Sequence, residues 1–233
     1  MKEQYKSITV EFWSRVFWIL SFISIFKTIR WILKKTVKPK NWHFVVDVWV
    51  LFNFFFALIS VFVVKYLNIG HYVYIFVIYG LIRVFEIIIY QINVLLFDEY
   101  RAKKENLSYK IFGYRRMIVN LLSNFVEIVL WFTVSYICFL TIHFIQDYEP
   151  SLPQIMLTSF SYTTGFGIHD LLSLRNLSNF GTIILYFQSI AGLIMTLISI
   201  TRFIGLLPRV ATTDEYENEL KTMCRHFQHT KKQ

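Results

Sequence analysis

Four long runs of apolar residues, separated by short polar segments, dominate the chain. A helix needs roughly 20 consecutive apolar residues to cross the hydrocarbon core of a bilayer, and each run reaches that length. The pattern therefore predicts an all-α membrane protein with four transmembrane helices. The predicted spans are residues 44–67, 72–97, 118–145 and 180–207.

The segment before the first span, residues 8–33, has a different pattern. Serine and threonine recur at helical spacing among aromatic residues, so we expect one helix with a narrow polar stripe. Its uninterrupted apolar core is too short for a span, and its tryptophan and basic residues suit a helix that lies in the membrane interface. A fifth spanning helix is the alternative.

Composition and charge place the chain in the membrane and orient it. The chain is 55% hydrophobic and carries a formal net charge of +9, and most of that charge lies in segments 27–40, 101–116 and 202–232. Basic loops stay on the cytoplasmic side, so we expect both termini in the cytoplasm and the protein in the plasma (inner) membrane. Its two cysteines lie in unrelated contexts, which excludes a disulfide framework.

These patterns divide the chain into five parts. They are an N-terminal helix with a basic linker (1–43), a transmembrane hairpin (44–97), a basic cytoplasmic loop (98–117), a domain of two spans with the segment between them (118–207) and a cytoplasmic tail (208–233).

The most specific motif lies between the third and fourth spans. Pro150 and Pro153 open a short stretch that we expect to be helical, and Thr163-Thr164-Gly165-Phe166-Gly167 follows it. Glycine adopts positive φ without strain, so Gly165 and Gly167 allow successive backbone carbonyls to point the same way. A stack of such carbonyls can replace the hydration shell of a cation.

The order of membrane helix, short helix, Thr-x-Gly-aromatic-Gly loop and membrane helix resembles the pore domain of tetrameric potassium channels. The resemblance covers residues 120–208. It implies a pore helix, a homotetrameric pore and gating from the cytoplasmic side. It also implies a selectivity filter for K⁺ made of Thr163, Thr164, Gly165, Phe166 and Gly167, with the hydroxyl of Thr163 at the inner end.

The resemblance further implies two bending points in the last span, Gly192 and Gly205. A small residue such as Gly192 also permits close helix packing, and that alternative stays open. The chain departs from the family where Thr164 replaces the usual Val or Ile, and where Ile168 replaces the aspartate after the last glycine. Conduction of Na⁺ beside K⁺ therefore stays open.

Arg83 and Glu86 lie three residues apart in the second span and can share one helix face. Charges at that depth are costly unless they are paired. We therefore expect an intramembrane ion pair, with Asp47 or Tyr79 as further partners, that fixes the hairpin against the pore-like domain (118–207). A single arginine does not make a voltage sensor.

Basic side chains near the cytoplasmic face could form a positive ring in an oligomer. Such a ring could contact lipid headgroups, a nucleotide or an oligonucleotide, although positive-inside topology alone explains much of the charge. The candidates for these contacts are Lys34, Lys35, Arg101, Lys103, Lys104, Arg115 and Arg116.

The leading hypothesis is thus a homotetrameric channel for monovalent cations with no cofactor. Two other hypotheses stay open: a membrane-depolarising effector of bacterial antiviral defence that a nucleotide or oligonucleotide gates, and a non-conducting membrane scaffold. We expect no enzyme, catalytic residue or protein-bound metal, because the six histidines show no catalytic or ligand spacing.

Overall fold

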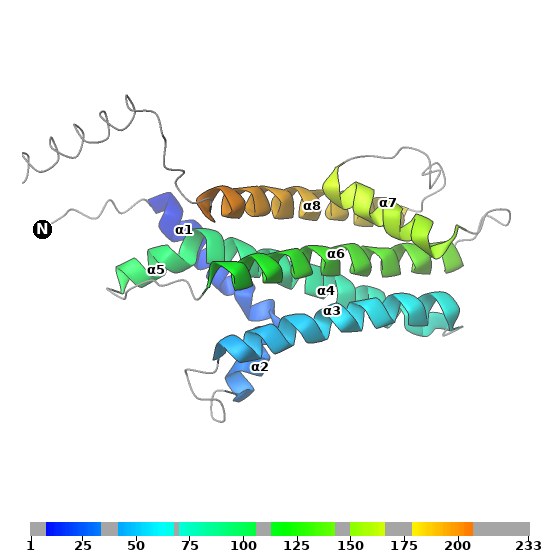
Figure 1. Ribbon diagram of the computed structural model, residues 1–233, viewed down its shortest axis with the longest axis horizontal. Helices are drawn as coiled ribbons and strands as arrows, with labels where there is room; N and C mark the ends of the chain where they lie inside the picture. The colour runs from blue at the N-terminus through cyan, green and yellow to red at the C-terminus, as the bar shows by residue number, and fades with distance from the viewer. Residues whose placement is uncertain are drawn as a thin grey trace, which may run out of the picture.

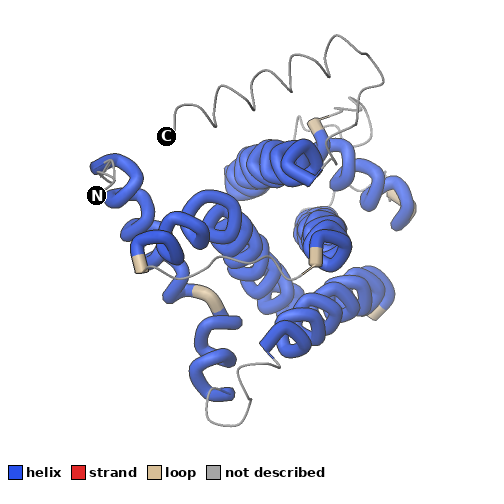
Figure 2. Tube along the Cα trace, turned by 60° about the vertical axis from the view of Figure 1, so that its left-hand side comes forward, coloured by secondary structure: helices blue, strands red, loops and turns tan. Residues whose placement is uncertain are grey.

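The computed structural model describes residues 8–33, 42–67, 70–105, 113–142, 150–165 and 179–206. These parts of the chain are helical and contain no strand (Figures 1 and 2). Four helices are long and apolar enough to cross a membrane, which indicates an integral membrane protein. The main helices are α1 (Ile8–Leu20), α2 (Ile25–Leu33), α3 (Trp42–Tyr66), α4 (Val73–Ile92), α5 (Asp98–Lys104), α6 (Tyr114–Ile142), α7 (Leu152–Thr164) and α8 (Asn179–Leu206).

Helix α6 holds the bundle together, because it contacts α3, α4, α7 and α8. Its Trp131 is 1% exposed and packs its ring edge-to-face against Phe56 of α3 and Tyr79 of α4. A Cβ atom on Gly80 would lie 2.7 Å from the Trp131 ring, so α4 can approach α6 this closely only with glycine there. The core of the hairpin and the core of the pore-like region are therefore continuous through α6.

The helix of the second predicted span continues past residue 97, where the sequence pattern placed the boundary of the span. Helix α4 continues through a wider helical turn, Asn93–Phe97, directly into α5, so the helical segment runs from Gly70 to Lys104. The side-chain amide of Asn93 donates 2.9 Å to the Ile89 carbonyl inside this wider turn. The first part of the predicted 98–117 loop is thus a helix.

The N-terminal segment is not the single helix that its periodicity predicted. Helix α1 and a short 3₁₀ turn, Ser21–Ile23, end at Ser24, whose backbone is extended with φ −67° and ψ 124° before α2 begins. With 13 and 9 residues, neither helix has the roughly 20 residues of a span. Helix α1 packs beside the end of α4 (Figure 1).

Candidate functional site

Helix α7 begins with a capping box. The Ser151 backbone N–H donates 2.8 Å to the side chain of Gln154, and Pro153 occupies the first turn, where its missing N–H costs nothing. The helix ends at Gly165, which has φ +76°. The structure therefore has a 13-residue helix at the place where the prolines predicted a short one.

The end of α7 presses against the middle of α8. A Cβ atom on Gly192 would overlap the Thr163 carbonyl oxygen and lie 2.7 Å from its carbonyl carbon. Gly192 is the fourteenth of the 28 residues of α8, roughly 20 Å from either end. Helix α7 thus begins near one end of the bundle and stops about halfway along α8 (Figure 1).

Gln188 of α8 connects the end of α7 to α6. Its side chain is 0% exposed, and its Nε2 donates 2.8 Å to the Ser159 carbonyl and 2.8 Å to the Thr163 hydroxyl. Its Oε1 accepts a hydrogen bond from the Tyr136 hydroxyl. The Ser159 hydroxyl donates 2.8 Å to the Val129 carbonyl, which ties the same point to α6 again.

The two threonines of the motif have different environments. Thr163 is 1% exposed, and its hydroxyl donates 2.8 Å to the Ser159 carbonyl while accepting from Gln188. Thr164 is half-buried, and its hydroxyl donates 2.9 Å to the Phe160 carbonyl. The hydroxyl of Thr163 is therefore held by partners within the packed helices of one chain. Phe166 and Gly167 lie outside the described residues.

A hollow of about 360 Å³ lies where α7 ends against α8. Three hydroxyl residues of α8, Thr182, Ser189 and Thr196, recur every seven residues on its exposed or half-exposed side, and the last two line this hollow. Helix α3 differs from α8 in this respect, because its exposed large side chains are apolar apart from the Tyr66 hydroxyl. The remaining lining residues of the hollow are Ser161, Tyr162, Thr163, Thr164, Gly165 and Leu193.

The two predicted hinge glycines also differ. Gly192 is buried against the backbone of Thr163, which makes it a packing contact in this structure. A Cβ atom on Gly205 would have no atom within 4 Å. Of these two glycines, Gly205 is the one with room for a larger side chain.

Arg83 and Glu86 form the expected pair, with a third member that sequence reasoning missed. Arg83 Nη1 lies 2.8 Å from Glu86 Oε2, and Arg83 Nε lies 2.7 Å from Oε1 of Glu127 on α6. All three residues are at most 3% exposed. Glu127 is the one acidic residue of the predicted third span. A lone acidic residue in an apolar run indicates a buried charge that needs a partner, so the sequence did contain a signal for Glu127.

The two further partners suggested by the sequence lie elsewhere. Asp47 accepts two hydrogen bonds of 2.8 Å from Arg116 Nε, and the Tyr79 hydroxyl donates 2.7 Å to Asn53. The arginine of the second span is thus fixed to α6 through Glu127 and not to α3 through Asp47.

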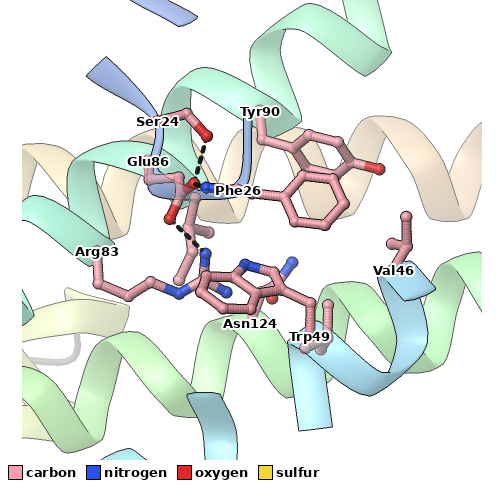
Figure 3. A pocket seen from close by; sticks show the side chains of 10 residues that line it. Ser24, Phe26, Val46, Trp49, Arg83, Glu86, Tyr90 and Asn124 are labelled. Atoms are coloured by element: carbon pink, nitrogen blue, oxygen red, sulfur yellow. Dashed lines mark hydrogen bonds and ion pairs between the residues drawn. The ribbon is translucent and has the colours of Figure 1, made fainter. Parts of the chain in front are cut away.

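The second oxygen of Glu86 holds the N-terminal segment. It accepts hydrogen bonds from the Ser24 hydroxyl and, at 2.7 Å, from the Phe26 N–H (Figure 3). The Phe26 N–H is one of the free donors in the first turn of α2, so Glu86 caps that helix from α4. The break at Ser24 is therefore set by a carboxylate 62 residues away.

Several of the basic residues proposed to form a ring are paired with acids. Lys103 lies 2.7 Å from Glu99, and Lys104 lies 3.0 Å from Glu11 of α1. The hydrogen bond from Lys104, with a weaker contribution from Arg15, holds the pKa of Glu11 below its usual 4.5.

Arg101 joins α5 to α1 and to the wider turn. It donates 3.0 Å to the Ser14 carbonyl and 2.8 Å to Asn93 Oδ1, and it lies 3.4 Å from Asp98. Arg116 binds Asp47, as described above, and Arg115 is exposed. Lys34 and Lys35 lie outside the described residues. The described residues thus use Arg101, Lys103, Lys104 and Arg116 to join helices or to pair locally, which weakens the expectation of an open anion site.

Within the described parts of the chain, no group of three or more His, Cys, Asp or Glu side chains is placed to hold a metal ion. Comparison of the chain with family models, with curated proteins and with solved structures gave no match.

Proposed function

We propose that this protein is a homotetrameric channel that conducts monovalent cations such as K⁺ along the backbone of residues 164–167, where α7 ends. One observation carries the proposal: α7 ends at the midpoint of the apolar helix α8, with Gly165 in the left-handed conformation beside a hydroxyl-lined hollow. A helix that stops at half the depth of a bilayer places non-helical backbone there. Such backbone is tolerated only where it is buried in protein or lines a water-filled path.

The orientation of α7 suits a cation. The last carbonyls of a helix have no partner within the helix and carry a partial negative charge. In this arrangement α7, the proposed pore helix, directs that charge toward the hollow at its end. Backbone carbonyls of Thr164 and the residues after it would then replace water around the ion.

A closed path needs several copies of the chain. Each chain has one such loop, and fourfold symmetry would place four loops around an axis. The hydroxyls of Thr182, Ser189 and Thr196 support α8 as the helix nearest that axis, because a wet pore wall tolerates hydroxyls better than lipid does. The positive charge of segments 27–40, 101–116 and 202–232 supports an orientation with both termini in the cytoplasm.

Ion flux through purified protein in liposomes tests the proposal, with K⁺ and then Na⁺ as the only permeant cation. Gly165→Ala should abolish the flux, because alanine at φ +76° is strained and shifts the carbonyls. Gly70→Ala is the matched control, because Gly70 also has positive φ (+54°) and free space but lies between α3 and α4, and it should leave the flux unchanged. Equal flux from the wild type and Gly165→Ala would overturn the proposal, as would a wild type that purifies as a monomer.

A further inference from the structure

A small cavity lies where α2, α3, α4 and α6 meet, beside the pair of Arg83 and Glu86 (Figure 3). Its volume is about 40 Å³. One water molecule needs roughly 10–15 Å³, so the cavity has room for about three or four waters and not for a larger organic ligand. Its other lining residues are Ser24, Phe26, Val46, Trp49, Val50, Ile87, Tyr90 and Asn124.

Two polar atoms of residues that line this cavity are buried without a hydrogen-bond partner. They are the indole Nε1 of Trp49 on α3 and the side-chain oxygen Oδ1 of Asn124 on α6. Asn124 is 3% exposed. The first atom is a donor and the second an acceptor, and each destabilises the fold if it stays unsatisfied.

Neighbouring side chains restrict the indole. The guanidinium carbon of Arg83 lies 5.5 Å from the centre of the Trp49 ring, and the Phe26 ring lies 5.9 Å from it. Arg83 is itself fixed by Glu86 and Glu127. The Trp49 side chain therefore cannot easily rotate its N–H toward another acceptor of the protein. Its acceptor has to be a molecule that occupies the cavity.

The charges nearby suggest a cation, but the donor of Trp49 argues against one. Arg83, Glu86 and Glu127 sum to a formal charge of −1, which would attract a cation. A cation would satisfy Asn124 Oδ1 and leave the Trp49 N–H facing a positive charge. Water satisfies both atoms, because it accepts from one and donates to the other.

We propose that this cavity is a binding site for ordered water that accepts a hydrogen bond from Trp49 Nε1 and donates one to Asn124 Oδ1. The water joins α3 to α6 and hydrates the side of the charged cluster where Glu86 holds Ser24 and Phe26. This proposal is independent of ion conduction.

A double-mutant cycle tests it by thermal unfolding of the purified protein in detergent. Trp49→Phe removes the N–H and keeps an aromatic ring, and Asn124→Leu removes the acceptor at similar volume. With bridging water, each single variant should lower the unfolding midpoint by roughly 2–4 °C or more. The double variant should lower it by clearly less than the sum, because the second change removes the group that the first left unsatisfied. Trp49→Phe also loses ring volume. This cost is the same with and without Asn124→Leu, so it cancels in the cycle.

Two other results would overturn the proposal. In a dry cavity, Asn124→Leu leaves the midpoint unchanged or raises it, and the two effects add. With a bound cation, Asn124→Leu lowers the midpoint, Trp49→Phe does not, and the midpoint of the wild type changes between Na⁺ and K⁺ at constant ionic strength. If a variant fails to fold, a high-resolution map of the wild type decides: density between the two atoms is expected, and an empty cavity contradicts the proposal.

Discussion

Gln188 on α8 donates a hydrogen bond of 2.8 Å to the hydroxyl of Thr163, the last buried residue of α7. The same amide binds the Ser159 carbonyl and accepts from Tyr136 of α6. One fully buried side chain thus fixes the end of α7, and with it the start of the proposed filter, to both long helices that flank it. We therefore expect Gln188 to determine how that end is positioned.

Gln188→Leu should destabilise the protein by about 2 kcal/mol, because it removes the acceptor of the buried Tyr136 hydroxyl and the donor to the Ser159 carbonyl and the Thr163 hydroxyl. That corresponds to roughly 4–8 °C in the unfolding midpoint of a chain of this size. In liposomes we also expect the variant to lose discrimination between K⁺ and Na⁺ before it loses flux.

Ser199→Ala is the control for Gln188→Leu. Ser199 lies on the same helix outside the lining of the hollow, and its hydroxyl binds within α8, to the Met195 carbonyl at 2.8 Å. It should change the midpoint little. A midpoint and ion selectivity for Gln188→Leu equal to those of Ser199→Ala would contradict the role assigned to Gln188.

The two glycines of α8 should respond oppositely to alanine. Gly192→Ala places a Cβ on the Thr163 carbonyl, so α7 must move away, and we expect a loss of about 2 kcal/mol or more and of ion flux. Gly205→Ala meets no atom and should stabilise the helix by up to about 1 kcal/mol. Thermal unfolding of the two variants measures both effects, and a tolerated Gly192→Ala would show that α7 does not press against α8.

The extent of the four spans could be predicted from the sequence because long apolar runs are local signals. Residues 180–207 were predicted, and α8 is Asn179–Leu206; residues 44–67 were predicted, and α3 is Trp42–Tyr66. The continuation of the second helix was not predicted, because residues 98–104 are polar and were assigned to a loop, whereas Asp98–Lys104 form a helix.

Long-range partners could not be predicted. The periodicity of residues 8–33 favoured one helix, and the break at Ser24 depends on Glu86, far along the chain. Similarly, the charge pattern predicted that Arg101 and Lys104 lie near the cytoplasmic face, but it carried no information about their partners, Ser14 and Glu11. Gln188 had a detectable signal, as an isolated amide in an apolar run.

The buried cluster predicts a large cost for removing its cation. Arg83→Met leaves Glu86 and Glu127 buried without their partner, and breaking such a cluster costs about 3–5 kcal/mol. We expect little folded protein, measured as the yield of monodisperse protein after extraction. Lys103→Met is the control, because its pair with Glu99 is exposed on both sides (69% and 57%) and contributes at most about 1 kcal/mol. A normal yield of Arg83→Met would show that the cluster does not stabilise the fold.

The contact between α1 and α5 should weaken in acid. The hydrogen bond from Lys104 lowers the pKa of Glu11, with Arg15 contributing less, so the carboxylate form is favoured in the folded protein. The stabilisation is complete above the usual pKa of 4.5 and is lost as pH falls through the lower pKa of the folded state. NMR titration of carbon-13-labelled glutamate in the purified protein measures this pKa. Lys104→Gln should raise the pKa toward 4.5, Arg15→Gln should raise it less, and Lys103→Gln, whose partner is Glu99, should leave it unchanged. An unchanged Glu11 pKa in Lys104→Gln would show that this ion pair does not hold α1 to α5.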